Sequence, residues 1–165
     1  MTAGASSWSF REEDAQRLQA ILGRFLHDAS ARTALIVDRT GQLVATVGEA
    51  PVFDPTAFAS LTAADFSAND QLARMLGEPE FGALFHQGER ESMYLADIAR
   101  RVILVVLFDT RTTLGLVKLR VKQAVGELNL LFTAMFDRDG AGRGPAMESE
   151  FLGEAEDEID KLFGA

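Results

Sequence analysis

The 165-residue chain contains no cysteine, and this absence removes several kinds of chemistry at once. Disulfide bonds, thiolate nucleophiles and zinc–sulfur sites all require that residue. A chain without cysteine suits a reducing compartment, so we expect a cytoplasmic protein. The sequence also shows no basic segment followed by an apolar one at its start, and no apolar run near the twenty or so residues of a membrane-spanning helix.

Residues that commonly carry catalysis are equally scarce. The only two histidines are His27, beside Asp28, and His86, near Glu89, and we interpret both as structural. The motifs HExxH and GxSxG and the glycine-rich phosphate-binding loops are absent. We therefore expect no enzymatic activity, no cofactor, no metal and no directly bound nucleotide.

Basic residues are outnumbered, and the formal net charge is −9 with a pI near 4.7. Such a charge repels phosphate backbones and argues against nucleic-acid binding. The acidity is concentrated in residues 148–161, with seven carboxylates and one lysine, whereas residues 111–122 carry four basic groups and no acidic one. This division indicates two functional surfaces, although a solvated acidic segment is the simpler alternative.

The clearest structural signal is the apolar run Val102–Phe108, which is rich in β-branched residues. Such a run predicts a strand that is covered on both faces. Thr112 and Thr113 follow as N-cap candidates for a helix that starts near Leu114. Because no glycine-rich loop separates strand and helix, a nucleotide site is not expected at this junction.

Periodicity along the remaining chain predicts three helices and four further strands, which make five with the strand over residues 102–108. The predicted helices cover residues 10–31, 55–76 and 113–135, and the predicted strands cover 33–37, 42–47, 83–88, 91–96 and 102–108. Because most strand connections are short, this order predicts an α/β (α+β) three-layer α/β/α sandwich with a five-stranded, mostly antiparallel sheet.

Local signals mark several helix ends. Ser9 and Glu12 have the spacing of a capping box for the first helix. Asp54 is the predicted N-cap of the second helix, which Gly77 and the following Pro79 end. Within the third helix, the residues predicted to be buried are Leu116, Leu119, Val125, Leu128, Leu131 and Phe132.

Three segments are predicted along the chain: a domain over residues 1–136, a flexible linker over 137–147 and an acidic amphipathic helix over 148–165. The last segment carries apolar residues at helical spacing, namely Phe151, Ala155, Ile159, Leu162 and Phe163. A purely solvating tail has no need of such anchors. We therefore favour a segment that folds into a groove on binding over a merely solvated extension.

The middle helix has two distinct sides. The side predicted to be buried carries Phe58, Leu61, Ala68, Leu72 and Met75. The other side is small or neutral and carries Ser60, Ala63, Ala64, Ser67 and Gln71. A charge-poor exposed side suits a partner-binding surface; packing against another helix of the same chain is the alternative.

Particular segments in this order resemble the roadblock family, over about residues 10–136. The matching segments are Val37–Leu43, Leu61–Ala63, Leu72–Phe81, Phe85–Gly88 and Phe108–Leu119, with a short further match at Glu158–Phe163. Single segments are weak evidence, but their order and spacing together are specific.

The resemblance implies a homodimer that pairs its middle helix and an edge strand across a two-fold axis. It further implies a GTPase-activating protein for a Ras-like GTPase, with one GTPase per dimer, in the cytoplasm and at a cell pole. No arginine finger is expected, so Arg39, Arg74 and Arg111 are interpreted as surface or interface groups. The implied GTPase contacts are Ser60, Ala63, Ala64, Ser67, Ala68 and Gln71.

The C-terminal helix is implied to contact the GTPase at a separate place and to favour nucleotide exchange. Its anchors are Phe151, Ile159, Leu162 and Phe163. One departure concerns the middle helix, where the family tends to small, neutral residues and this chain has Asp65, Asn69 and Asp70. If these three face the GTPase, the docking details or the partner differ.

Two other functions stay open at this point. A roadblock dimer can act as a scaffold that recruits a GTPase or other partners without altering GTP turnover. A small-molecule sensor would need a polar cluster that faces inward, and the sequence identifies none.

Overall fold

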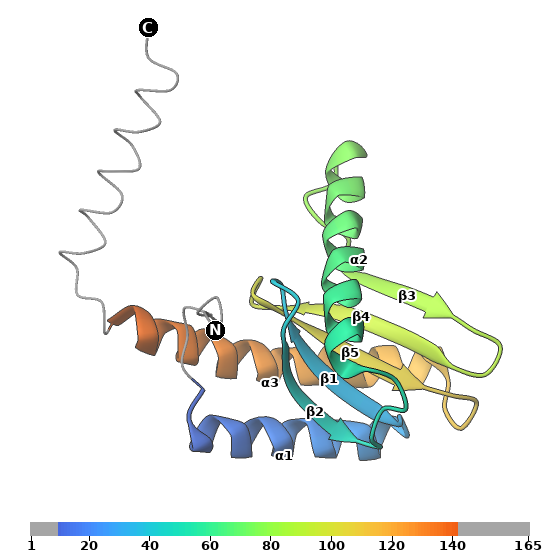
Figure 1. Cartoon of the computed structure of the whole chain (residues 1–165), viewed down its shortest axis with the longest axis horizontal. Coiled ribbons are helices and arrows are strands. Elements are labelled where there is room, and N and C mark those ends of the chain that lie inside the picture. The colour runs from blue at the N-terminus through green and yellow to red at the C-terminus, as the bar shows by residue number, and fades with distance from the viewer. Residues whose placement is uncertain (1–9, 142–165) are drawn as a thin grey trace, which may run out of the picture.

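The computed structural model describes residues 10–141 as three helices and five strands. The helices are α1 (Glu12–Ala29), α2 (Pro55–Met75) and α3 (Leu114–Ala141), and the strands are β1 (Thr33–Asp38), β2 (Leu43–Gly48), β3 (Ala83–Gln87), β4 (Ser92–Ile98) and β5 (Val102–Phe108). The strands form one sheet in the order β2-β1-β5-β4-β3, and every pairing is antiparallel. Helices α1 and α3 cover one face and α2 covers the other (Figure 1). The predicted three-layer sandwich is confirmed.

Strand β5 lies at the centre of the sheet and supplies both apolar clusters of the domain. Val102, Leu104 and Val106 belong to the cluster beneath α1 and α3. Ile103 and Val105 alternate with them and belong to the smaller cluster beneath α2. Burial on both faces explains why this strand lacks the polar alternation of a one-sided strand.

The hairpin between β1 and β2 depends on two glycines with positive φ. At Gly41 (φ 96°) the chain reverses, and the Gly41 N–H donates to the Asp38 carbonyl oxygen over 2.9 Å. At Gly48 (φ 100°) an added Cβ would lie 2.4 Å from the backbone oxygen of Arg32. A side chain is therefore excluded at Gly48 by conformation and by space.

The predicted caps of α2 and α3 are confirmed. The Asp54 carboxylate accepts from the Thr56 N–H over 3.0 Å, and Thr113 Oγ1 accepts from the Leu116 N–H over 3.2 Å. Gly77 (φ 81°) ends α2, and its N–H donates to the Arg74 carbonyl oxygen over 3.1 Å. The left-handed glycine satisfies helix carbonyl groups that would otherwise lack a partner.

Helix α1 begins differently from the prediction. Its N-cap is Arg11, whose backbone N–H donates to the Asp14 carboxylate over 3.1 Å. Glu12 is therefore the first helical residue and not the third, and the predicted pairing of Ser9 with Glu12 is wrong for this helix start; Ser9 itself lies outside the described residues. Asp14 performs the reciprocal part of a capping box.

Helix α3 is longer than predicted and includes residues 137–141, the first part of the predicted linker. The Arg101 guanidinium lies 4.8 Å from the centre of the Phe136 ring, and Arg138 forms a 2.8 Å ion pair with Asp14. These contacts hold the last turns against the domain, so composition alone misplaced the helix end. The rest of the linker and the predicted tail helix lie outside the described residues.

The buried side of α3 also differs in part from the side predicted from the sequence. Leu128, Leu131 and Phe132 are buried as predicted, but Leu119 is exposed and Leu116 half-buried. Their expected places in the core are taken by Val117, Val121 and Ala124. Within residues 10–141, none of the three helices combines the length and apolarity needed to cross a membrane.

Candidate partner-binding surface on α2

Helix α2 lies alone on its face of the sheet, and its C-terminal end projects beyond the sheet (Figure 1). The residues that face the sheet recur every three or four positions, as expected for one side of a helix. Its buried residues are Ala59, Thr62, Ala63, Phe66, Asn69 and Ala73. Most are small, so the helix backbone comes close to the strands.

The predicted buried side of α2 is therefore wrong for Leu61, Ala68, Leu72 and Met75, whereas Phe58 packs against the cluster beneath the helix as predicted. Leu61, Leu72 and Met75 are 70%, 54% and 81% exposed. The close approach of α2 to the sheet explains the difference, because small residues and one aromatic ring fill the space beneath the helix. The larger aliphatic side chains consequently lie on the outer surface.

These exposed residues form an apolar stripe with Ala68, because positions 61, 68, 72 and 75 share one side of a helix. The stripe lies toward β3, as the neighbouring Asp65 shows: its carboxylate is 2.6 Å from Nε2 of His86 on β3. Among the described strands, β3 forms an edge of the sheet and pairs with β4 alone. We call the apolar stripe and this edge the α2–β3 surface.

A second exposed stripe lies on the other side of α2. It comprises Ser60, Ala64, Ser67 and Gln71, all exposed, and we call it the small-residue stripe. Ser60 places it toward the β1–β2 turn, because its hydroxyl donates to the Gly41 carbonyl oxygen over 3.5 Å. None of the four side chains is charged, so a partner can cover them without removing water from an ion.

The structure thus divides the residues that the resemblance implied for GTPase contact. Four of them share the small-residue stripe, and Ala68 lies on the apolar stripe. Ala63 is only 7% exposed and packs against the sheet beside Phe66. The tail anchors Phe151, Ile159, Leu162 and Phe163 lie outside the described residues.

Of the three polar residues that depart from the family pattern, two contact basic side chains of the same chain and the third is buried. Asp65 contacts His86, Asn69 is buried, and Asp70 forms a 2.5 Å ion pair with Arg39. Because the Asp65 and Asp70 carboxylates contact basic side chains and Asn69 is neutral and buried, these residues do not add charge to the small-residue stripe.

Arg39 is the centre of a polar contact between α2 and the sheet, which local sequence reasoning missed. Its guanidinium pairs with Asp70 on α2 and with Asp97 on β4, and it lies 5.0 Å from the centre of the Phe66 ring. Burial alone would lower the pKa of Arg39, but hydrogen bonds to Asp97 and Asp70 raise it above its ordinary value. Arg39 therefore stays charged and holds α2 in place.

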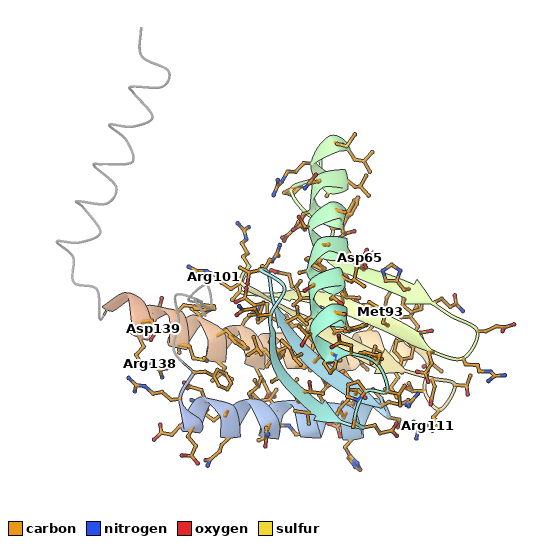
Figure 2. The ribbon with its side chains drawn as sticks, in the orientation of Figure 1. Asp65, Met93, Arg101, Arg111, Arg138 and Asp139 are labelled. Carbon is orange, nitrogen blue, oxygen red and sulfur yellow. The ribbon has the colours of Figure 1, made fainter. Side chains whose placement is uncertain are left out.

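Arg111 is also engaged within the chain. It forms ion pairs with Asp109 over 3.0 Å and with Glu49 over 3.4 Å. Hydrogen bonding to Arg111 lowers the pKa of the Asp109 carboxyl below its ordinary range. Figure 2 shows Arg111 well away from the projecting end of α2. In the part of the chain that the structure describes, no three histidine or carboxylate side chains gather to hold a metal ion.

The comparisons with known proteins now identify the family. The family model described as Roadblock/LC7 domain matches residues 17–108, more than half of the chain. The chain belongs to the Roadblock/LC7 family. The predicted resemblance, which depended on the order and spacing of particular sequence segments, is confirmed.

Similarity to two solved structures shows that the roadblock protein is MglB-like. It is 42% identical to Myxococcus xanthus MglB, covering 72% of this chain and 96% of that one with a TM-score of 0.69. It is 32% identical to the gliding protein MglB from Thermus thermophilus, covering 77% and 96% with a TM-score of 0.71. A Roadblock/LC7 domain from Streptomyces avermitilis, at 10% identity and a TM-score of 0.63, shares the fold alone. No curated protein sequence matches.

Proposed function

We propose that this roadblock protein is a homodimeric GTPase-activating protein and regulator of a Ras-like GTPase of the MglA type, and that it acts in bacterial cell polarity and motility. The observation that carries the proposal is the exposed, charge-free small-residue stripe on α2, in a chain 42% identical to Myxococcus xanthus MglB. Small side chains let a partner's backbone come close, and interface cores are typically depleted of charge.

The α2–β3 surface supports the homodimer. Three large apolar side chains, Leu61, Leu72 and Met75, lie exposed beside a sheet edge with unpaired backbone groups. A second copy related by a two-fold axis would cover the apolar stripe and pair β3 with β3. The small-residue stripes of both copies would then stay accessible to one GTPase.

Activation would work through the conformation of the GTPase. Arg39 and Arg111 are held by carboxylates of their own chain, which suits structural roles and not that of an arginine finger. The dimer would instead bind the hydrolysis-competent conformation of the GTPase most tightly and raise its population. Each tenfold increase in that population ratio requires about 1.4 kcal/mol of differential binding.

GTP hydrolysis by a cognate MglA-type GTPase, measured with and without this protein, tests the proposal. Addition of the protein should raise the turnover rate. Ser67→Arg should return turnover to the intrinsic rate and leave the dimer intact, because a long charged side chain would block the small-residue stripe. The matched control is Gln19→Arg on the exposed part of α1. An unchanged rate with Ser67→Arg would contradict the proposed binding surface.

The same assay separates an activator from a scaffold. A scaffold would bind the GTPase through the same stripe, because both functions need an accessible, charge-poor surface. Binding that leaves turnover at the intrinsic rate would establish the scaffold and reject the activator.

Residues 148–165 are proposed as a second GTPase contact, anchored by Phe151, Ile159, Leu162 and Phe163. Deleting this segment should weaken GTPase affinity or nucleotide exchange, while the domain still folds. Normal affinity and normal exchange by the shortened protein would reject the second contact.

A further inference from the structure

The outer seam between α1 and α3 is hollowed on the face of the domain opposite α2. Two adjoining hollows share Ile21, Arg24 and Glu127 and form one groove, which we call the α1–α3 groove. The larger hollow, of about 380 Å³, lies toward the C-terminal end of α3 and is lined there by Leu130 and Ala134.

The α1–α3 groove is apolar where it is widest. Leu130 is 76% exposed, whereas Leu128 and Leu131 of the same helix are buried. Ala20 and Ala134 line the same hollow, so short side chains leave room above it. An apolar ridge beside an open hollow is a surface that an amphipathic segment can cover favourably.

The charges along the groove favour an acidic occupant. Arg17, Arg24 and Arg120 line it, against Asp28 and Glu127. Arg24 pairs with Glu127 over 2.6 Å. Arg17 forms no ion pair with any side chain of residues 10–141 and is therefore available to a carboxylate from elsewhere in the chain.

The chain leaves α3 at the same end of this groove. The 2.8 Å ion pair between Arg138 and Asp14 holds the end of α3 against the start of α1, and Figure 2 shows Arg138 and Asp139 there. Residues 142–147 can span up to about 20 Å when extended. Residues 148–165 would be about 27 Å long as a helix. The acidic segment can therefore turn back and reach the whole apolar part of the groove.

We propose that residues 148–165 dock in the α1–α3 groove of their own chain as an antiparallel amphipathic helix when no GTPase is bound, and leave the groove when they contact the GTPase. Leu130 lies eleven residues before Ala141, and Ile159 lies eleven residues after Glu148. Each separation is about 16 Å along a helix, so the two side chains meet if the acidic helix starts beside the end of α3. With the apolar side packed into the groove, Glu148, Glu156 and Glu158 lie on or at the margins of that side, next to a groove that holds Arg17 and Arg24.

Cysteine cross-linking in the full chain tests this docking, because the native sequence contains no cysteine. Leu130→Cys combined with Ile159→Cys should oxidise to an intrachain disulfide that migrates as a compact monomer on a non-reducing gel. The matched control combines Ser67→Cys, exposed on α2, with Ile159→Cys. The groove pair should oxidise about tenfold faster than the control pair, because docking raises the local thiol concentration.

A third variant tests the charge contribution. Adding Arg17→Glu and Arg24→Glu to the groove pair should slow the cross-link several-fold while circular dichroism stays native. Equal oxidation rates for the groove and control pairs, or a disulfide that joins two chains, would overturn the proposal. The measurement uses no GTPase, so its result does not depend on the proposed function.

Discussion

The carboxylate of Asp14 accepts a 2.8 Å hydrogen bond from the guanidinium of Arg138, although the two residues are 124 positions apart. Asp14 is 5% exposed and also accepts the backbone N–H of Arg11. One side chain therefore caps the start of α1 and holds the last turns of α3. The same carboxylate thus contributes to both helix ends.

Asp14→Asn should lower the free energy of unfolding by about 1–3 kcal/mol, because it weakens the cap and removes the ion pair with Arg138. Urea unfolding at pH 7 measures the change. Glu12→Gln removes an exposed carboxylate from the same helix turn and should change stability by no more than about 0.5 kcal/mol.

The effect of Asp14→Asn should also depend on pH. The hydrogen bond from Arg138 is the main cause that lowers the pKa of Asp14 below its ordinary 3.8; burial opposes it, and the backbone N–H of Arg11 adds to it. A depressed folded pKa contributes stability that is complete above 3.8 and is lost as the pH falls through the folded value. The difference in free energy of unfolding between the native protein and Asp14→Asn should therefore stay constant near neutral pH and become smaller in acid. A gap that widens in acid would contradict the assigned ion pair.

Arg39→Ala should destabilise the domain by about 1–3 kcal/mol, because Asp70 and Asp97 would be left close together without their shared cation. The stability of Arg39→Lys should lie between that of the native protein and that of Arg39→Ala. The lysine ammonium keeps the charge but cannot bridge both carboxylates as the planar guanidinium does. Chemical denaturation measures both changes, with Arg90→Ala in the exposed β3–β4 turn as the control. A lysine variant with full stability but no stimulated GTP turnover would instead indicate a catalytic arginine.

Leu72→Glu should convert the homodimer to a monomer, because it places a charge in the centre of the α2–β3 surface. Leu119→Glu on α3 is a close control, since both leucines are 54% exposed. Sedimentation equilibrium at micromolar concentration compares the two. A dimer that survives Leu72→Glu, or that dissociates equally with Leu119→Glu, would place the interface elsewhere.

The neighbours Ala63 and Ala64 should respond in opposite ways to enlargement. Ala63→Leu should destabilise the domain by about 1–3 kcal/mol, because Ala63 is packed against the sheet. Ala64→Arg should leave the unfolding midpoint unchanged and abolish stimulated GTP turnover, because Ala64 is exposed on the small-residue stripe. Thermal unfolding and the turnover assay together distinguish a packing position from a recognition position.

The helices and strands were predictable from sequence where the apolar periodicity agreed with the capping and turn residues. The run Val102–Phe108 is the central strand, and Asp54, Gly77 and Thr113 lie at the predicted helix ends. These features depend on residues close together in the chain, so local physics determines them. The end of α3 depends on Arg101 and Asp14 instead, and neither is local to it.

The surface of α2 was harder to predict because large aliphatic residues were assumed to be buried. Ala59, Phe66 and Ala73 at seven-residue steps were the available signal for the inner side. Helix periodicity cannot show that a sheet lies close enough to favour alanine over leucine. The Arg39 contact had no local signal, since its partners are 31 and 58 residues away.

The two faces of the sheet are unequal in a way that bears on how this protein can evolve. Among residues 10–141, the cluster beneath α1 and α3 contains 21 buried residues and the cluster beneath α2 contains eight. Most of the buried apolar side chains in this part of the chain therefore lie on the side of the sheet opposite α2. Substitutions on the outward stripes of α2 do not touch the larger cluster beneath α1 and α3. The binding partner can therefore change during evolution while the domain stays folded.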